Sequence, residues 1–375
     1  MRILHLADLH IGKKVNGFDM IGDQIYALKQ IIYLVEKKAI EVVLIAGDIY
    51  DTKVPSSESV KLFDDFLTCL NEMKVKVVMI SGNHDSQERL SFARNLLRNQ
   101  EVYISGPFEE KVEKVSLRDE YGPLNFYLLP FIKPINVKKY YPDIELNDFQ
   151  GAIEKVMEAT DIDEGQRNVI VAHQYIVGAA TSDSEELYIG GIEAISADLF
   201  DRFDYVAMGH IHKKQSFRNG TIRYPGSLLK YSKSESSYKK SLTIVDIKEK
   251  GTIDIYEEDI EYLRDMRSIE GYYMDIIQAS EYDDNKTDYL HVTLYDEDPI
   301  PDVMARIREI YPNLMTLVYK NSSTDKIEME KQEMRKSKDP FDLFNEFYEY
   351  RNNRKLDDRK SKLVKDIIND VWGDI

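Results

Sequence analysis

The feature that most constrains the fold is the alternation, through the first half of the chain, of short apolar runs with segments of helical periodicity. The apolar runs predict strands at residues 2–7, 42–46, 75–81, 168–172 and 205–208. Between them, apolar side chains at every third or fourth position predict helices at residues 23–38 and 57–74. Further strand patterns occur at residues 125–130, 222–225, 241–246 and 252–255. This alternation is typical of an α/β protein whose helices cover the faces of sheets, and it extends to residue 262.

The rest of the chain has a different organisation. Residues 263–320 predict a small α+β domain. From about residue 267 its order is a helix, a strand at 289–295, a helix at 301–311 and a strand at 315–319. Residues 321–338 are highly charged and predict a linker. Residues 339–375 then predict two amphipathic helices, which begin at an Asp-Pro pair suited to a helix start. Two such helices have little core of their own, so we expect them to bind a partner surface, the alternative being that they pack on the body.

The charge distribution is uneven. Fifty basic and 67 acidic residues give a net charge of −17, which excludes a protein that binds nucleic acid with its whole surface. Residues 213–240 nevertheless contain eight Lys or Arg and one acid, Glu235, for a local charge of +7. Residues 351–365 contain seven basic and two acidic residues, for +5. Either run is a candidate phosphate-binding surface, and the alternative is a solvated face.

The expected compartment is the cytoplasm. The single cysteine, Cys69, cannot form an intramolecular disulfide, which favours a reducing environment. The first ten residues become polar too early for a secretory signal, and no segment approaches the roughly 18 apolar residues of a membrane helix. We therefore expect no contact with a membrane.

Polar residues of the types that bind metals follow five of the predicted strands. They are Asp8 and His10; Asp48 and Asp51; Asn83, His84 and Asp85; His173; and His210 and His212. Five of the seven histidines fall in these turns, and the two exceptions, His5 and His291, are expected to be structural. The carboxyl ends of strands in a layered α/β fold form sites, so these residues are expected to converge. In extended chain, residues i and i+2 point the same way, which predicts that Asp8 pairs with His10 and His210 with His212.

The residue types indicate the chemistry. Asp, His and Asn ligands without Cys suit Mn²⁺, Fe²⁺ or Zn²⁺ in a two-metal site better than a structural zinc. Two such ions can share a bridging carboxylate and activate water for in-line attack on phosphorus. The sequence therefore predicts phosphoester hydrolysis.

Together the segments LHLADLHIG, GDIYD, SGNHD, AHQY and GHIH resemble the calcineurin-like metallophosphoesterases, and within them the SbcD family of bacterial nuclease subunits. IYPNL in the small domain and DPFDLFNEFYE in the tail resemble the same family. The resemblance implies a four-layer α/β/β/α core, a capping domain at residues 263–320 and C-terminal helices. It also implies two divalent ions, with Mn²⁺ as the expected metal, and an exonuclease and endonuclease that acts on DNA ends and hairpins.

The resemblance also implies roles for individual residues. One ion is expected on Asp8, His10, Asp48 and His212, and the other on Asp48, Asn83, His173 and His210. His84 is expected beside the scissile phosphate, as proton donor or stabiliser of charge, and Asp51 as the carboxylate that orients it. Archaeal and eukaryotic relatives often have His at the position of Asp51. Asp85 is expected to be structural.

DNA contacts are expected from the basic stretch that follows the last ligands. The candidates are Lys213, Lys214, Arg218, Arg223 and Lys230, with Arg89 as a further one. The family resemblance implies a homodimer, associated through the C-terminal helices with an ATPase of the SbcC type in a heterotetramer located at the nucleoid. The chain itself has no Gly-rich Lys-Ser/Thr phosphate loop. The alternatives are a phosphoesterase for small substrates or phosphoproteins, and a DNA-tethering scaffold with incidental cleavage.

Overall fold

The structure is a computed structural model of the whole chain. It describes residues 1–146, 148–185 and 193–320, together with residues 341, 344, 345, 348, 356 and 360–365. None of the helices within these residues is long and apolar enough to cross a membrane.

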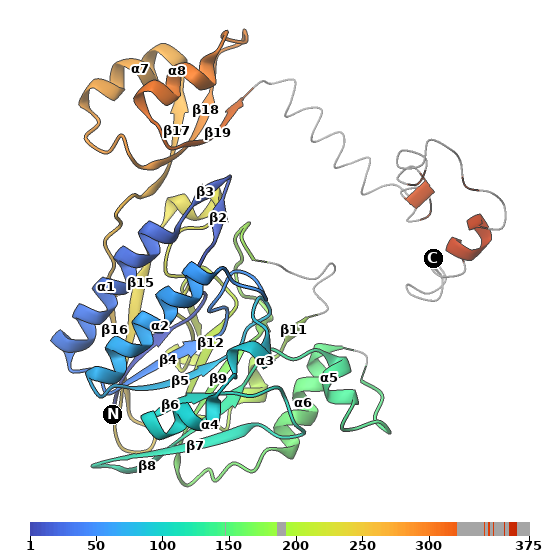
Figure 1. Cartoon of the computed structure of the whole chain (residues 1–375). Coiled ribbons are helices and arrows are strands. Elements are labelled where there is room, and N and C mark those ends of the chain that lie inside the picture. Colours follow the sequence, from blue (N-terminus) through green and yellow to red (C-terminus); the bar gives the residue numbers. More distant parts are fainter. Residues whose placement is uncertain are drawn as a thin grey trace. The chain divides into compact units, whose positions relative to one another are not determined.

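Two six-stranded sheets form the body of the protein (Figure 1). The first has the order β16-β15-β1-β4-β5-β6, and its members are β1 (Arg2–Leu6), β4 (Val42–Ala46), β5 (Lys76–Ile80), β6 (Val102–Ile104), β15 (Ser241–Ile247) and β16 (Ile253–Asp259). The second has the order β13-β14-β12-β9-β8-β7, and its members are β7 (Glu113–Asp119), β8 (Gly122–Leu129), β9 (Arg167–His173), β12 (Tyr205–Gly209), β13 (Gln215–Phe217) and β14 (Ile222–Tyr224). In each sheet the strands that carry candidate ligands run parallel: β1, β4 and β5 in the first, β9 and β12 in the second.

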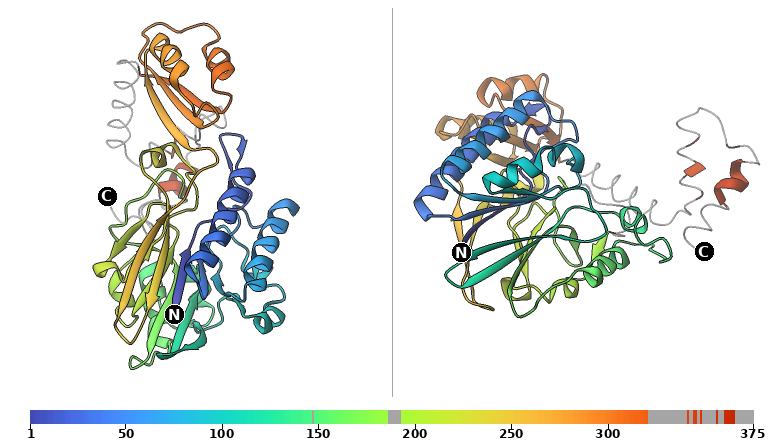
Figure 2. Two further views of the ribbon diagram at one scale, coloured as in Figure 1. Left: turned by 90° about the vertical axis from the view of Figure 1, so that its left-hand side faces the viewer. Right: turned by 60° about the horizontal axis from the view of Figure 1, so that its bottom comes forward.

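Helices cover the outer faces of both sheets, which gives four layers (Figure 2). On the first sheet lie α1 (Ile21–Lys38) and α2 (Ser57–Glu72), and on the second α6 (Phe149–Ala159). Short helices complete the body: α3 (Gln87–Leu90), α4 (Arg94–Leu97) and α5 (Pro134–Lys138). The α/β/β/α architecture expected from the sequence is confirmed.

The alternation of side chains along the buried strands explains the layers. In β4, Val43 and Ile45 pack with α1 and α2, whereas Val42 and Leu44 belong to the core between the sheets. In β9, Ile170 contributes to the core under α6 while its neighbours face the first sheet. Both faces of these strands are buried, so they are apolar throughout, and each such side chain contributes about 1.5–3 kcal/mol to stability.

Strand β7 and helix α6 are among the elements of the body that were not predicted. Strand β7 has alternating polar residues because it lies at the edge of the second sheet, paired only with β8. Helix α6 follows a long polar segment; Asp148 caps it by accepting a hydrogen bond from the N–H of Gly151 at 2.8 Å.

The second half of the chain contains a three-stranded sheet with the order β17-β18-β19. Its elements are β17 (Met266–Gly271), α7 (Tyr273–Ala279), β18 (Tyr289–Leu294), α8 (Val303–Ile310) and β19 (Leu314–Tyr319), of which β17 was not predicted. The chain divides into two compact units: Met1–Ile269 with Tyr282–Val292 and Met304–Thr316, and Glu270–Glu281 with Thr293–Val303 and Leu317–Ile375. The predicted linker at 321–338 lies outside the described residues, as does most of the predicted helix pair. The domain boundaries at 262, 320 and 338 stay predictions.

Candidate metal centre

The candidate ligands follow directly on the ends of five parallel strands. Asp8 and His10 follow β1, Asp48 follows β4, and a hydrogen bond of 3.1 Å from the N–H of Asp8 to the carbonyl of Gly47 joins these two turns. The N–H of His210, after β12, donates to the Asp8 carboxylate at 3.0 Å. The turns of both sheets therefore meet, as the strand order requires.

The backbone at the site is unusual. Asp8, His10, Asp48 and His210 all have positive φ, at 52°, 45°, 48° and 100°. Such conformations are costly for residues other than glycine and cluster at functional sites. The prediction that Asp8 and His10 act as a pair in extended chain is therefore wrong in its reason, although the two residues do come together. The corresponding prediction for His210 and His212 is also wrong, because the side chain of His210 lies next to Asn83 whereas that of His212 lies next to His10.

Glycines are required where the turns cross. A Cβ atom on Gly209 would lie 1.8 Å from the carbonyl oxygen of Ala46, and one on Gly82 would lie 2.1 Å from the Asp48 carboxylate. Any larger residue at either position would separate the turns that carry the ligands.

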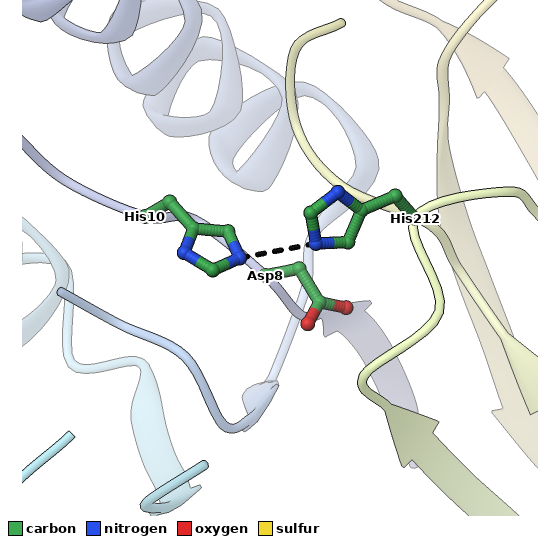
Figure 3. Close-up of side chains that lie close together, drawn as sticks. All are labelled: Asp8, His10 and His212. Atoms are coloured by element: carbon green, nitrogen blue, oxygen red, sulfur yellow. Dashed lines mark hydrogen bonds between the residues drawn. The ribbon is translucent and has the colours of Figure 1, made fainter. Parts of the chain in front are cut away.

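One group of ligands consists of Asp8, His10 and His212 (Figure 3). The Nε2 atoms of His10 and His212 lie 3.1 Å apart, and one ligand atom from each of the three residues lies within 4.8 Å of the others. All three side chains are buried.

The second group lies on the other side of Asp48. Asn83 Oδ1 is 3.0 Å from His173 Nε2 and 3.1 Å from His210 Nδ1. Asp48 Oδ2 is 3.3 Å from His173 Nε2 and 3.7 Å from His10 Nε2, so this single oxygen faces both groups. Its other oxygen accepts the main-chain N–H of His84 at 2.9 Å, which fixes the carboxylate.

The outward-facing nitrogens of two histidines have hydrogen-bond partners, and that of a third lies near a carboxylate. Nδ1 of His173 lies 2.7 Å from the Ala46 carbonyl, Nδ1 of His212 lies 2.5 Å from Ser184 Oγ, and Nδ1 of His10 lies 3.4 Å from the Asp51 carboxylate. A carbonyl or carboxylate next to Nδ1 favours the tautomer with the proton there, which leaves the Nε2 lone pair for the centre. His210 differs, because it presents Nδ1 to Asn83.

The electrostatics favour positive charge at the centre. Burial opposes ionisation of Asp48, but His173 and His10 hold the pKa of Asp48 well below its usual value. Burial raises the pKa of Asp8 to about 6. Burial lowers the pKa of His10 and of His210 to about 3, so neither imidazole carries a proton charge at neutral pH. For His173, Asp48 outweighs burial and raises the pKa to about 9.

These observations fit two divalent cations. In the first group, the Nε2 atoms of His10 and His212, 3.1 Å apart, and the carboxylate of Asp8 lie close enough together to coordinate one cation. In the second group, the amide oxygen of Asn83 lies within 3.1 Å of a nitrogen of His173 and of a nitrogen of His210, so these three side chains can also coordinate one cation. The donors are imidazole nitrogens, carboxylates and an amide oxygen, which suits Mn²⁺, Fe²⁺ or Zn²⁺.

His84 is half-buried next to both groups, with its ring centroid 4.7 Å from that of His10. Its Nδ1 lies 2.9 Å from the main-chain carbonyl of Asp51, not from the carboxylate that the sequence led us to expect. The Asp51 carboxylate instead contacts Lys13 Nζ at 2.6 Å and His10. Asp51 therefore supports His84 through its backbone and a ligand through its side chain.

Asp85, His5 and His291, which were predicted to be structural, each make hydrogen bonds within the protein. Asp85 is buried and accepts main-chain N–H bonds from Ile49, Tyr50 and Gly82 at 2.9–3.1 Å, which holds two of the ligand turns together. His5 Nδ1 lies 2.9 Å from the hydroxyl of Tyr205 within the core, and His291 Nδ1 lies 2.7 Å from Thr316 Oγ1. The predictions for these three residues are confirmed.

Most of the predicted DNA contacts lie in ion pairs. Lys230 is buried with its Nζ 2.8 Å from Asp265, and Arg223 is buried against Glu257, so the prediction that these two bind phosphate is wrong. Lys214 also pairs with Glu257, at 2.6 Å, and Arg218 pairs with Asp198. Lys213 and Arg89 are exposed, and their role stays a prediction.

Sequence reasoning missed the residues that hold His212. The one acid of the basic stretch, Glu235, is fully buried and pairs with the buried Lys240. Glu235 also accepts a hydrogen bond of 2.5 Å from the hydroxyl of Ser184. The same hydroxyl contacts Nδ1 of His212. The sequence did offer one signal for this buried ion pair: Glu235 is the single acid among eight basic residues. An acid surrounded by basic residues in the sequence is a candidate for burial, because one of them can neutralise its charge.

The centre opens to solvent on one side. A cavity of about 690 Å³ is bordered by Asn83 and His84, together with Asp51, Lys53 and Lys133. Its lining includes a ligand of one group and the histidine between both groups, so a substrate in the cavity reaches the centre directly.

Two family models match the chain. The calcineurin-like phosphoesterase model matches residues 1–214, and the model described as the type 5 capsule protein repressor C-terminal domain matches residues 262–352. The SbcD component of the nuclease SbcCD from Staphylococcus epidermidis is 34% identical over 376 residues, which cover 98% of each chain.

Two solved structures are also similar in part. A protein named TT1561 from Thermus thermophilus has a TM-score of 0.39 at 14% identity and covers 68% of this chain and 98% of its own. A dimetal phosphatase from Danio rerio has a TM-score of 0.40 at 11% identity and covers 70% of this chain and 98% of its own.

Proposed function

Because this chain belongs to the calcineurin-like phosphoesterases, and within them to the SbcD nuclease subunits, we propose that it is a two-metal DNA nuclease. The observation that carries the proposal is that ligand side chains from five strand ends converge on both sides of one carboxylate, that of Asp48. The first cation is held by Asp8, His10, Asp48 and His212, and the second by Asp48, Asn83, His173 and His210. Mn²⁺ is the metal we propose.

Divalent cations at these positions supply positive charge for a phosphodiester and acidify water at neutral pH. Asp48 is kept ionised by His173 and His10, and its orientation is fixed by the N–H of His84, so it can face both ions at once. His84 borders the cavity, and its ring is held by the Asp51 carbonyl. We assign His84 the transfer of a proton to the leaving oxygen, or the stabilisation of charge on the phosphate.

The partner is proposed from the relative's name, which describes one subunit of a nuclease. The chain would form a homodimer that binds an SbcC-type ATPase through the helices predicted at residues 339–375, and act at the nucleoid. Truncation before residue 339 should leave manganese-dependent nicking by the isolated subunit intact and abolish co-purification with the ATPase. Undiminished partner binding by the truncated chain contradicts this assignment.

The nuclease function is tested with end-labelled hairpin and duplex DNA, incubated with the purified chain in Mn²⁺ or in EDTA. Cleavage in Mn²⁺ that EDTA stops, and that Asp48→Asn abolishes, is the expected result. A small chromogenic diester, bis(p-nitrophenyl) phosphate, is assayed in parallel. Turnover of the diester without any cleavage of DNA would identify a phosphoesterase for small substrates, and binding of DNA without hydrolysis of either would identify a scaffold.

A further inference from the structure

The cavity at the metal centre continues into two more. The first cavity, of about 690 Å³, shares Gln87, Glu88, Ile135 and Asn136 with a second of about 620 Å³. The second shares Pro107, Phe108 and Glu109 with a third of about 260 Å³. Because neighbouring cavities share walls, they form one groove that begins at His84 and leads away from the metal centre. We call it the α5 groove, since helix α5 and the residues around it line its first two parts.

Exposed cations outnumber exposed acids along the α5 groove. Its first two parts contain four exposed lysines, Lys53, Lys133, Lys138 and Lys139, and two exposed glutamates, Glu88 and Glu109. Two further acids line the first part, but Asp51 is paired with Lys13 and Asp85 is buried. Within the part of the chain that the structure describes, no carboxylate lies at ion-pair distance from Lys53, Lys138 or Lys139. This excess occurs in a chain of net charge −17. Lysines beside a nuclease centre that are not paired with acids are suited to phosphate.

This arrangement contrasts with the basic stretch at residues 213–240. There, Lys214, Arg218, Arg223, Lys230 and Lys240 all contact carboxylates. A cation already paired with an acid gains less from phosphate, because the existing pair must be broken. The groove is therefore the better candidate for the path of the nucleic acid.

The α5 groove also offers apolar surfaces. Ile135 is 69% exposed, which is unusual for an isoleucine, and it lies where the first and second cavities meet. Tyr140 lines the second cavity, with its ring packed edge-on against Phe108 and with Lys139 Nζ 5.2 Å from its centroid. A cationic groove with aromatic and apolar side chains is typical of proteins that bind single strands, since exposed bases stack on such side chains. The bases of a duplex are stacked on each other and do not reach such surfaces.

We propose that the α5 groove binds one single-stranded DNA segment adjacent to the scissile phosphate, with Lys138 and Lys139 at its phosphates and with Ile135 and Tyr140 at its bases. Cavities of 620–690 Å³ are of the size that holds a drug-sized molecule, which corresponds to about one or two nucleotides each. The proposal rests on the proposed nuclease function and specifies its substrate: a strand that has separated from its complement before it reaches the metals.

The test uses the double variant Lys138→Ala/Lys139→Ala in the full chain. Its matched control is Lys29→Ala/Lys37→Ala, which removes the same charge from exposed positions of α1 outside the groove. Binding of a labelled single-stranded oligonucleotide and of a blunt duplex is measured in EDTA, which prevents cleavage, at several salt concentrations. Hydrolysis of bis(p-nitrophenyl) phosphate in Mn²⁺ reports the metal centre independently, since one molecule of this diester fills a single cavity and Lys138 and Lys139 line only the second one.

The groove variant should bind the single strand about tenfold more weakly than the control does. Its salt slope should fall by about 0.7 for each phosphate that the variant no longer neutralises, or about 1.4 in all. Turnover of the small diester should stay within about twofold of the unmodified chain. In the separate variant Ile135→Ser, single-strand affinity should fall severalfold and duplex affinity should not change.

Equal single-strand affinity in the groove and control variants contradicts the proposal, and so does an equal or larger loss for the duplex. Failure of the nuclease function gives a different result, because the unmodified chain then hydrolyses neither DNA nor the small diester in Mn²⁺, whatever the binding data show.

Discussion

The Nε2 atoms of His10 and His212 lie 3.1 Å apart, although 202 positions separate these residues in the chain. His10 follows the end of β1 in one sheet, and His212 follows the end of β12 in the other. The pair therefore exists only when the two sheets are packed against each other through the core between them. The metal centre is a property of the layered fold, and not of either sheet alone.

Replacement of His84 by Gln should reduce hydrolysis of DNA and of the small diester by about 10²–10⁴-fold, the usual contribution of a positioned acid or base. His84 is not one of the proposed ligands, so the manganese content and the thermal midpoint should not change. Turnover is measured by product formation at saturating Mn²⁺. Rates within about twofold of the unmodified chain would remove His84 from the reaction.

Replacement of Ser184 by Ala should weaken manganese binding about tenfold, because it removes the partner of His212 Nδ1 and its link to Glu235. Affinity is measured by titration calorimetry, which does not depend on turnover. The control is Ser237→Ala, at an exposed serine of the same region. Equal affinities in the two variants would show that Ser184 does not position the ligand.

Replacement of Lys240 by Met should lower the free energy of unfolding by about 3–5 kcal/mol, because the fully buried carboxylate of Glu235 loses its cation. The neighbouring variant Lys239→Met, at an exposed position, should change stability by less than about 0.5 kcal/mol. Both are measured by urea denaturation. Adding Glu235→Gln to Lys240→Met should restore part of the loss, and no restoration would argue that the two side chains do not interact.

The ion pair of Asp119 predicts a pH dependence of stability. Burial opposes ionisation of this carboxyl group, but Arg167 at 2.6 Å and the N-terminal amine at 2.9 Å lower its pKa to about 2. A folded-state pKa below the unfolded value of about 3.9 stabilises the protein above that value, by about 2 kcal/mol, and this contribution is lost as the pH falls from 4 towards 2. The stability difference between the unmodified chain and Asp119→Asn should therefore shrink over this range. A difference that is constant between pH 5 and pH 2.5 would contradict this account.

The layers, and the presence of polar side chains at the ends of five strands, were predictable because both depend on local patterns. A strand buried on both faces, such as β4, has no polar residue before its end, so Asp48 marks the point where it leaves the core. In all five ligand turns a polar side chain of this kind stands at or just after the end of a strand, although β1 and β9 also contain buried polar residues such as His5 and Asn168. Edge strand β7 lacks such a pattern, since only one face is buried, and it was missed.

Partners of charged residues were not predictable from position in the chain. Glu257 pairs with Arg223, which is 34 residues away in the chain, and with Lys214, which is 43 residues away. These pairs form because Glu257 lies on β16, the edge strand of the first sheet, which brings it beside both side chains. Whether a lysine is exposed or paired is decided by such tertiary contacts. The lysines of the α5 groove are spread between residues 53 and 139, so no run of charge in the sequence indicated them.

The central claim is that two cations lie on either side of Asp48. Anomalous diffraction from crystals soaked in Mn²⁺ tests it most directly, because it locates each ion without reference to activity. The account predicts two peaks that share Asp48 Oδ2, one among Asp8, His10 and His212 and the other among Asn83, His173 and His210. A single peak, or peaks that do not contact Asp48, would contradict it.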